Sequence, residues 1–536
     1  MPEHPAKPLS GEHFDVLVIG GGINGVAIAR ECARGGKRVL ILEQNDFCSG
    51  ATSRSTRIIH GGLRYLEYSE IGLVRESLRE RERLRAERPH LVRPLKFLLA
   101  LGEGATHSAM AVRAGLWLYS ALGAGRSTAA DGELDRLERL LDSSQRWSIF
   151  HYDDAQCEFP ERLVAEWLRE AIEHGAEARN HTRVLEVATT DGRATGVRAH
   201  SLLENREFQA SADWIINASG PWADLVCAAS SVRTGSPLLG GVRGSHLIVR
   251  RFPGAPEAAV YTEAVDGRPV FVVPWNGQLL VGSTEVRDDE DPCETEPSDD
   301  EISYLFTSLA RLFPAAQLSW SDVPASFAGV RPLPYSPGDK ASAITRKHFL
   351  HDHSEEGARG MISVIGGKLT TAAALARECS REIGIHTPEP ALVAAPSAAE
   401  IESTLAGWSR SVAQRTHIPE TFARALAEWH GAGAAEIAHA AMMDERLREP
   451  VCEHSQHIVA EAVAAARREC AVTLGDILLR RVPVALGACW SDECGRIAAR
   501  RIGYALGWSL SRIAREREAF EEERSMFLRR VAAVAR

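Results

Sequence analysis

Six polar side chains stand out because each lies beside a glycine or at the end of an apolar run. They are Arg64, Tyr65, His246, Arg331, Arg346 and Lys368, in the segments HGGLRY, RGSHLIV, AGVRPLP, AITRK and IGGKLTT. Arginine binds a phosphate group through two parallel N–H donors, and lysine acts as a point charge. Taken singly, each residue could be an ordinary surface charge or a hydrogen-bonded strand residue. Together, they would surround one pocket suited to an anionic substrate such as a phosphate ester.

The elements that would position these side chains begin with residues 14–43, FDVLVIGGGINGVAIARECARGGKRVLILE. Two apolar runs, 16–19 and 39–42, are typical of buried strands, and residues 26–34 have helical spacing. A glycine turn joins the first strand to the helix. This order of strand, glycine turn, helix, strand and acid predicts a dinucleotide-binding βαβ unit. The alternative is a glycine-rich turn in an ordinary α/β unit.

Each residue type in this unit has a physical reason. Gly20 allows the tight turn, Gly22 lets the backbone approach a pyrophosphate, and Gly25 lets the helix and strand pack closely. The helix N-terminus offers free N–H groups to the phosphates. Glu43 can accept hydrogen bonds from ribose hydroxyls, which favours FAD or NAD over NADP.

Two later segments also run from an apolar strand into a turn of small residues. They are WIINASGPW at 214–222 and MISVIGGKLTT at 361–371. Several such turns predict a long cofactor that crosses several strand ends, which fits FAD better than NAD.

Length and composition limit the class of protein. At 536 residues the chain is too long for one core, and its net charge of −10 argues against nucleic-acid binding. The N-terminus lacks the apolar region of a signal peptide, and no run of about 18 apolar residues predicts a transmembrane helix. The 10 cysteines form no CxxC pair, so neither a zinc ribbon nor an iron–sulfur cluster is indicated, and no metal ligand is assigned. They are expected to be reduced thiols of a cytosolic protein.

Nine segments carry a resemblance to a known family. They read VIGGGINGVAIAR, ATSRSTRIIHGGLRYLE, INASGPWAD, RGSHLIV, VPWNGQLLVGSTE, AGVRPLP, AITRK, VIGGKLTT and AVTLGDILLRR. The chain resembles the FAD-dependent glycerol-3-phosphate dehydrogenases of the D-amino-acid-oxidase-like flavoprotein superfamily, from about Phe14 to Leu486. Three departures are visible: a GTTD-like turn of the family reads Gly282-Ser283-Thr284-Glu285 here, the flavin loop carries the extra cations Arg54 and Arg57, and residues 124–147 match the family poorly.

The resemblance implies an α/β fold with three parts. A Rossmann-like FAD-binding domain would comprise residues 14–90, 150–235 and 345–385. An inserted mixed β-sheet substrate domain would comprise 91–149 and 236–344, and a C-terminal helical domain 395–536. Residues 285–301, which are strongly acidic, are expected to form a solvated surface loop.

The resemblance also implies roles for individual residues. Arg64, Tyr65, Arg346 and Lys368 would bind the substrate phosphate, and His246 and Arg331 would face the reacting C2 hydroxyl. The implied FAD-binding residues are Gly20, Gly22, Asn24, Gly25, Glu43, Ser53, Ser55, His60, Gly62, Val184, Gly220, Trp222, Gly366, Gly367, Lys368, Leu369 and Thr370.

The implied reaction is oxidation of sn-glycerol 3-phosphate to dihydroxyacetone phosphate, with hydride transfer to flavin N5. His246 is the expected base, because an imidazole with a near-neutral pKa suits proton abstraction, and Arg331 would stabilise developing charge. The electrons would pass to a quinone. The alternatives are a glycerol-3-phosphate oxidase that uses oxygen and a non-catalytic flavin-binding subunit.

A quinone acceptor raises the question of membrane contact. Three segments could touch an anionic bilayer surface: Arg75–Leu101, Ala109–Gly123 and the basic Phe527–Arg536. The alternatives are core packing for the first two and a frayed surface helix for the third. The expected location is the cytoplasm or the inner face of the cell membrane, and the expected assembly is a homo-oligomer.

Overall fold

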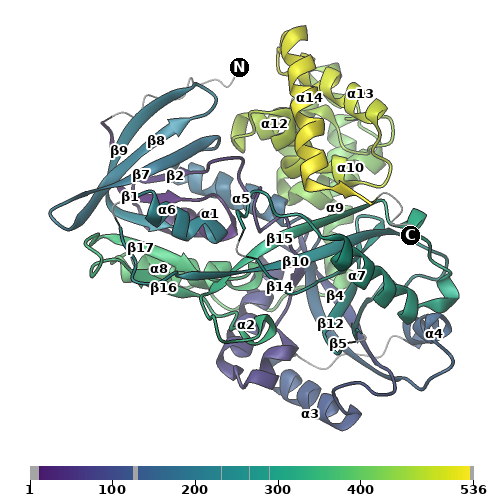
Figure 1. The fold of residues 1–536 in the computed structure, drawn as a ribbon. Coiled ribbons are helices and arrows are strands. Elements are labelled where there is room, and N and C mark those ends of the chain that lie inside the picture. The colour runs from purple at the N-terminus through teal and green to yellow at the C-terminus, as the bar shows by residue number, and fades with distance from the viewer. Residues whose placement is uncertain (1–10, 125–130, 231, 265, 289, 532–536) are drawn as a thin grey trace.

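The protein is described by a computed structural model that covers residues 11–124, 131–230, 232–264, 266–288 and 290–531. Figure 1 shows two β-sheets side by side, with a group of helices above one end of them. The first sheet carries the dinucleotide-binding unit, and the second sheet is mostly antiparallel.

The first sheet has the strand order β16-β17-β9-β1-β2-β6, and a hairpin of β7 and β8 extends from β9. Neighbouring strands from β17 to β6 run parallel, as in a βαβ fold. Its strands are β1 (His13–Ile19), β2 (Val39–Leu42), β6 (Glu177–Arg179), β7 (Thr182–Thr190), β8 (Arg193–Ser201), β9 (Arg206–Asn217), β16 (Phe349–Asp352) and β17 (Met361–Ile365).

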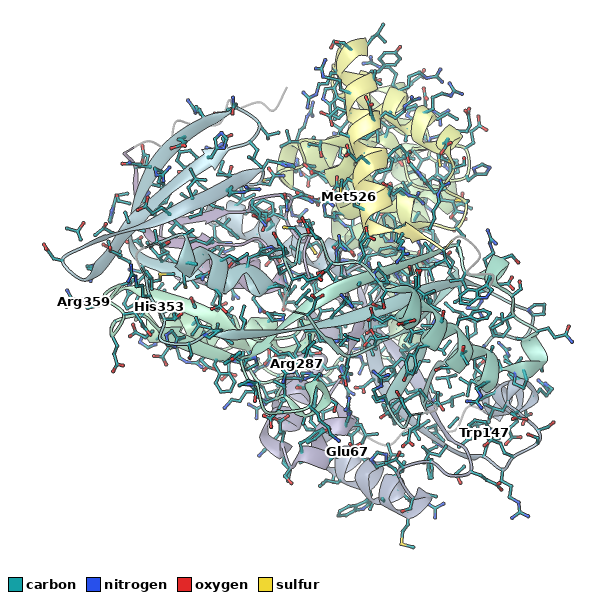
Figure 2. All side chains as sticks on the ribbon, viewed as in Figure 1. Glu67, Trp147, Arg287, His353, Arg359 and Met526 are labelled. Carbon is teal, nitrogen blue, oxygen red and sulfur yellow. The ribbon has the colours of Figure 1, made fainter. Side chains whose placement is uncertain are left out.

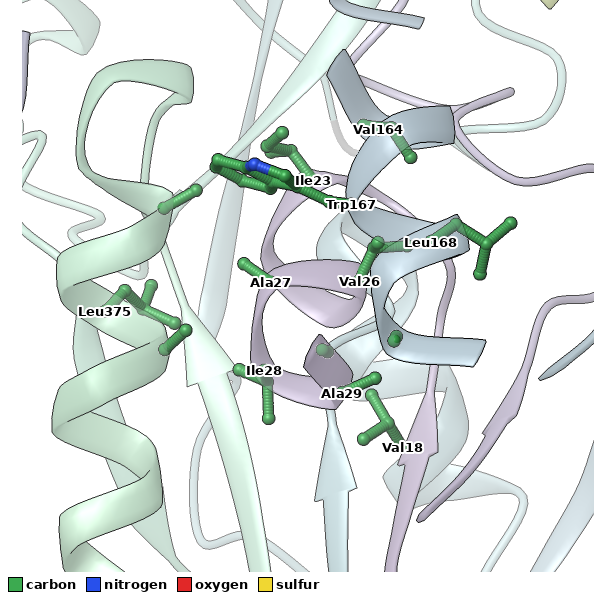
Figure 3. Packing of buried hydrophobic residues seen from close by; sticks show 14 of the residues in the cluster. Val18, Ile23, Val26, Ala27, Ile28, Ala29, Val164, Trp167, Leu168 and Leu375 are labelled. Carbon is green, nitrogen blue, oxygen red and sulfur yellow. The ribbon is translucent and has the colours of Figure 1, made fainter. Parts of the chain in front are cut away.

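Helix α1 (Ile23–Arg34) lies between α5 (Pro160–Glu173) and α8 (Ala372–Glu382), as Figure 3 shows. The apolar residues of α1 pack against both neighbours. Trp167 of α5 is fully buried in this layer, near Ile23 and Ala27. The buried Trp167 ring packs against α1, the helix that follows the glycine turn. This packing holds the βαβ unit rigid, which a binding site for phosphates requires.

The second sheet has the order β18-β15-β10-β13-β12-β11-β4-β5-β3, with β14 paired to β10. Only the β11–β4 pair is parallel among the strand pairs described for it. Its strands are β3 (Ile58–Ile59), β4 (Val92–Leu101), β5 (Ser148–Cys157), β10 (Leu239–Arg250), β11 (Ala259–Glu263), β12 (Pro269–Trp275), β13 (Gln278–Gly282), β14 (Val286–Arg287), β15 (Ala325–Pro334) and β18 (Arg529–Arg530). Strand β5 pairs with β4 along its whole length, so residues 148–157 belong to this sheet.

Four helices connect or cover the second sheet: α2 (Ile71–Glu87), α3 (Ala109–Tyr119), α4 (Asp131–Leu140) and α7 (Asp299–Leu312). In Figure 1, α3 lies at the bottom of the molecule, at the opposite end from the C-terminal helices. Strand β4 is a buried interior strand, so the second half of segment 75–101 packs in the core rather than on a surface.

The C-terminal part is helical, as expected. It contains α9 (Ala398–Thr416), α10 (Glu420–His430), α11 (Ala434–Met443), α12 (Val459–Arg468), α13 (Asp492–Ala505) and α14 (Leu510–Phe527). After α14 the chain returns to the second sheet, where Arg529 and Arg530 pair with β15. Within the basic segment 527–536, Phe527 ends α14, and Arg529 and Arg530 form an edge strand of the second sheet. Residues 532–536 lie outside the described ranges.

The predicted fold class is confirmed: a Rossmann-like α/β domain, a mixed sheet and a C-terminal helical part. The expectation of a solvated loop at 285–301 is correct only for the middle of the segment, where Glu290, Asp291, Cys293, Glu294 and Glu296 are exposed outside helices and strands. It is wrong for the two ends. Glu285 is 11% exposed in its side chain, and Asp288 and Glu301 are buried in ion pairs with Arg243. No helix in the described ranges is long and apolar enough to cross a bilayer. All 10 cysteines lie in those ranges and are free thiols.

Candidate active site

One cavity of about 400 Å³ is lined by both sheets and by the loops at their ends. It brings together the glycine turns and the six polar residues that the sequence predicts to surround one pocket. Of the residues assigned to FAD or substrate, those that line it are Gly20, Gly22, Asn24, Glu43, Ser55, His60, Gly62, Arg64, Tyr65, Val184, Gly220, Trp222, His246, Arg331, Arg346, Gly366, Gly367, Lys368, Leu369 and Thr370. Gly25 and Ser53 do not.

Gly25 acts through packing. A Cβ atom there would lie 1.9 Å from the backbone oxygen of Gly20, so only glycine lets α1 approach the turn this closely. Gly22 is the N-cap of α1 and has no side-chain cap. The Ile23 N–H donates to the Thr52 Oγ1 at 3.1 Å, and the positive dipole end of the helix faces the cavity, which suits a diphosphate.

Glu43 closes the same end of the cavity. Its Oε2 accepts a hydrogen bond from the Gly21 N–H at 2.7 Å, and its Oε1 accepts one from the Asn45 N–H at 2.9 Å. Burial raises the pKa of this carboxyl, with the two backbone donors opposing the shift. Because each carboxylate oxygen has a second lone pair, Glu43 can still accept a ribose hydroxyl.

The turn at Gly366 and Gly367 follows strand β17 and packs against α1. The Asn24 Nδ2 donates to the Gly366 oxygen at 3.3 Å, and a Cβ on Gly367 would lie 2.6 Å from that Nδ2. Gly367 has a φ of +94°, a conformation that side chains rarely adopt. The second glycine turn is thus fixed against the first, although 342 residues separate Asn24 from Gly366 in the chain.

The other end of the cavity holds a cluster of cations around one carboxylate. Glu285 Oε1 accepts from Arg346 Nη2 at 2.7 Å and from Arg64 Nη1 at 3.4 Å, while its Oε2 is buried and has no partner among the described residues. Arg331 donates to the Ser283 Oγ at 2.5 Å and to the Thr284 oxygen at 3.2 Å. Burial, and next the charge of Arg346, lower the pKa of Arg331 to about 10, so it remains a cation at neutral pH.

Lys368 completes the cluster from the glycine turn. Its Nζ donates to the Ser77 Oγ at 2.6 Å and lies 4.4 Å from the centre of the Tyr65 ring. Burial lowers the pKa of Lys368 to about 7, because its nearest charged neighbours compensate only in part for the loss of water. The site therefore holds more positive charge than its own residues neutralise, and it favours an anion.

His246 lies on β10, stacked on Phe327 with ring centres 5.0 Å apart, and its Nε2 is 2.9 Å from the Thr56 Oγ1. Burial, and then the charges of Arg331 and Arg57, lower the pKa of His246 to about 3. The expectation of a near-neutral imidazole is therefore wrong for the protein alone. The ring is neutral and can accept a proton, but it is a weak base until an anion offsets these charges.

The loop 53–57 divides its side chains between the cavity and the core. Ser53 donates to the Cys48 oxygen at 2.6 Å, behind the cavity wall. Arg57 is fully buried and pairs with Glu161 through two contacts of 2.8 Å, so this extra cation is structural. Arg54 donates to the Ala328 oxygen at 3.1 Å and stacks over Phe527.

The sequence reasoning missed three functional candidates: Thr56, Ser283 and Glu285. The signal for two of them was the GSTE turn after β13, which departs from the family pattern. The sequence shows this turn as a departure from the family pattern but assigns no site role to it, and Glu285 also begins the acidic segment 285–301. Thr56 has no local signal, because its partner His246 is 190 residues away.

These features fit FAD. The cavity is lined by the N-terminus of α1 with an acid beside it, by a second glycine turn that packs against this helix, and by the cation cluster that Lys368 joins from that turn. A long cofactor with a diphosphate at its centre and a flat ring system at its reactive end matches that sequence of environments.

Comparisons with known proteins agree with this site. The model of the family described as FAD dependent oxidoreductase matches residues 15–381, and the C-terminal domain of alpha-glycerophosphate oxidase matches residues 398–513. A glycerol-3-phosphate dehydrogenase of Synechocystis is 37% identical over 523 residues, covering 90% of this chain and 93% of the relative. Glycerol-3-phosphate dehydrogenase 2 of Mycobacterium tuberculosis is 30% identical, covering 95% of this chain and 88% of the relative.

Solved structures share the fold. The glycerol-3-phosphate dehydrogenase from Bacillus halodurans complexed with FAD superposes with a TM-score of 0.73 at 23% identity, covering 98% of this chain and 97% of that one. The FAD-bound L-alpha-glycerophosphate oxidase from Mycoplasma pneumoniae gives a TM-score of 0.53 at 18% identity, covering 71% and 97%.

The chain is therefore a flavoprotein oxidoreductase that uses FAD. Within that class it belongs to the family of FAD-dependent glycerol-3-phosphate dehydrogenases, and the resemblance drawn from the sequence motifs is confirmed.

Proposed function

We propose that this protein oxidises sn-glycerol 3-phosphate to dihydroxyacetone phosphate and passes the electrons to a membrane quinone. The observation that carries the proposal is the cation cluster of Arg64, Arg331, Arg346 and Lys368, which lines the same cavity as the glycine turns. A small phosphate ester would bind there beside the cofactor. The names of the relatives support the same substrate.

In this proposal the protein binds and orients the substrate. Arg346 and Arg64 already share Glu285 as a partner, and Lys368 is held by Ser77, so these donors are in place before the phosphate arrives. Binding energy from the phosphate end then positions the reacting carbon. Arg331 donates toward the C2 oxygen, and neutral His246 accepts the hydroxyl proton at a ring nitrogen. When bound, FAD supplies the hydride-accepting chemistry.

Anaerobic reduction of the flavin tests the substrate. Purified holoenzyme is mixed without oxygen with glycerol 3-phosphate, glycerol or a set of amino acids, and the flavin absorbance is followed. Glycerol 3-phosphate should bleach the flavin rapidly, and the other compounds should not. Equal bleaching by glycerol would contradict the role of the cation cluster, and bleaching by an amino acid alone would contradict the proposed function.

The pKa of Lys368 gives a pH dependence. Protonated Lys368 attracts the phosphate, so kcat/KM for glycerol 3-phosphate should fall as the pH rises through the free-enzyme pKa of about 7. The variant Lys368→Arg keeps a cation at all these pH values and should lose this alkaline decline. Steady-state kinetics with an artificial dye as acceptor between pH 5.5 and 9 measure both profiles. An unchanged decline in the variant would assign the titration to another group.

Helix α3 supports the quinone as acceptor. Its sequence AMAVRAGLWLY is almost entirely apolar, yet among its residues only Tyr119 is buried. Met110 and Trp117 are 79% and 73% exposed, and Tyr68 and Ile71 nearby on η1 (Leu63–Tyr68) and α2 are 42% and 46% exposed. Such a patch suits insertion into the headgroup layer of a bilayer. Because η1 also carries Arg64 and Tyr65, the patch adjoins the substrate end of the cavity.

A double variant tests this contact. Met110→Ser/Trp117→Ser should bind anionic phospholipid vesicles at least about tenfold more weakly, because two large apolar side chains no longer enter the bilayer. Its activity with a soluble dye should stay unchanged. Met443 is equally exposed, at 79%, on the C-terminal helix α11, so Met443→Ser is the matched control and should leave vesicle binding intact.

The competing acceptor is oxygen. An oxidase would form hydrogen peroxide at a rate close to its dye-linked rate in air-saturated buffer. A quinone-linked dehydrogenase would reduce a short-chain quinone rapidly and oxygen slowly. Parallel measurement of the two rates separates these outcomes, and fast peroxide formation would overturn the quinone assignment without affecting the substrate assignment.

A further inference from the structure

A second group of chemically active side chains lies outside the cavity, at the edge of the first sheet. His351, His353 and Glu356 belong to the segment HDHSEE at the end of the edge strand β16. Each offers one ligand atom, and these atoms all lie within 4.8 Å of one another. Figure 2 shows His353 at this margin of the molecule, away from the C-terminal helices.

The orientation of His353 leaves one ring nitrogen directed at Glu356. Its Nε2 lies 2.8 Å from the Ser363 Oγ, which also accepts a hydrogen bond from the Asn217 Nδ2 at 3.1 Å. The other nitrogen, Nδ1, is 3.6 Å from the Glu356 Oε2. Both of these atoms are buried without a hydrogen-bond partner in the described part of the chain, and the His353 side chain is 0% exposed.

An unpartnered imidazole nitrogen that faces an unpartnered carboxylate oxygen costs free energy. A cation between them would remove that cost. His351 approaches from the other side, with its Nε2 3.0 Å from the Glu356 Oε1. The two rings lie 4.6 Å apart, centre to centre, and nearly perpendicular at 74°. Three ligand atoms from three side chains therefore converge on one point.

We propose that His351 Nε2, His353 Nδ1 and the Glu356 carboxylate form a binding site for a divalent transition-metal ion, with zinc as the preferred ion and water as its fourth ligand. Tetrahedral zinc with bonds of about 2.0–2.1 Å places its ligand atoms about 3.3 Å apart. The His–Glu separations of 3.0 Å and 3.6 Å bracket that value. The three ligand atoms, which all lie within 4.8 Å of one another, would move closer together to bind the ion.

The ligand types select the ion. Two imidazoles and one carboxylate suit zinc, nickel or copper, whereas magnesium and calcium prefer six or more oxygen ligands. Ser363 provides the outer hydrogen bond that metal-bound histidines usually have, because its Oγ can accept the Nε2–H of His353. That tautomer leaves Nδ1 with the lone pair that a metal requires.

The expected role is structural. Ser363 belongs to β17, which leads to Gly366, and Asn217 ends β9, which leads to the turn at Gly220. Metal binding would tie the segment after β16 to both strands, behind two turns that line the cofactor cavity. The ion takes no part in the oxidation itself.

Equilibrium dialysis of the holoenzyme against zinc, with metal analysis by mass spectrometry, tests the proposal. After treatment with a chelator, the wild-type protein should bind one zinc ion per chain at this site and gain several degrees in Tm. The variants His351→Gln and Glu356→Gln should bind that ion at least tenfold more weakly and lose the gain in Tm. Magnesium should produce neither effect.

The control is His200→Gln, since His200 lies on a hairpin of the same sheet and contacts only Asn205 among its described hydrogen-bond partners. It should behave like the wild type. His351 is only partly buried, so its variant should fold, and a retained flavin spectrum verifies that. Zinc binding with the same affinity and stoichiometry in the wild type and in His351→Gln would overturn the proposal, as would the absence of any zinc-dependent gain in Tm.

Discussion

Replacing Arg331 with alanine is expected to lower kcat/KM for glycerol 3-phosphate about 10³-fold, a loss of about 4 kcal/mol in transition-state stabilisation. Two contacts, to the Ser283 Oγ and the Thr284 oxygen, hold the guanidinium inside the cavity. A buried donor that is already oriented stabilises developing charge more strongly than a mobile or solvated one. The large effect follows because water cannot reproduce this geometry.

The control for Arg331 is another arginine of the same cavity. Arg183 lines it next to Val184, and its side chain is exposed. Arg183→Gln should leave kcat/KM for glycerol 3-phosphate unchanged. Arg331→Lys should recover only part of the loss, because lysine keeps the charge but not the two-pronged donor. A change of less than tenfold in Arg331→Ala, with FAD content intact, would remove Arg331 from the proposed site.

The variant Asp46→Asn is expected to cost about 3–5 kcal/mol of stability, the largest effect on folding that we predict. Asp46 is buried in the loop after the opening βαβ unit, where its carboxylate accepts from Arg481 at 2.6 Å and 2.8 Å and also pairs with Arg480. Both arginines come from the helical part. Arg480 keeps Glu523 and Asp476 as partners, at 2.7 Å and 3.4 Å, whereas Arg481 loses the carboxylate that it binds with two donors and becomes a poorly compensated buried cation.

Thermal unfolding of the FAD-saturated protein measures this loss, and limited proteolysis locates it. We expect a lower Tm and faster cleavage between residues 388 and 397, the segment that joins the first sheet's last helix to α9. Glu402→Gln is the control, because Glu402 also binds an arginine through two contacts, of 2.6 Å and 2.8 Å, but is 62% exposed. That surface pair should contribute less than about 1 kcal/mol. Equal losses in the two variants would contradict the role assigned to Asp46.

The structure also changes the view of the C-terminal helices. The sequence predicts them as a C-terminal helical domain over residues 395–536. The buried pairs of Asp46 with Arg481 and of Arg162 with Glu469 instead fasten them to the first sheet's loops and to α5. Strand β18 adds a connection to the second sheet. None of these contacts has a local sequence signal, because each joins residues more than 200 positions apart.

The sequence by itself determined the cofactor, the fold class and most of the residues around the cavity. These features depend on short-range rules: Gly20, Gly25 and Glu43 must occur at set distances within one βαβ unit, and a phosphate-binding turn needs a glycine where a Cβ would collide. The family motifs added His246, Arg331 and Lys368 on the same basis, since each lies in a short segment with its own pattern. Such local patterns can be recognised from the sequence without a structure.

Only the tertiary structure decided the electrostatics and the partners. It placed Glu285 between Arg64 and Arg346, lowered the pKa of His246 to about 3, and directed Arg57 to Glu161 instead of to the cofactor. It also brought the Nδ1 of His353 within 3.6 Å of the Glu356 Oε2. The physical reason is that the energy of a charge depends on how much water the fold removes and on which distant charges it brings near, and neither quantity is encoded in neighbouring residues.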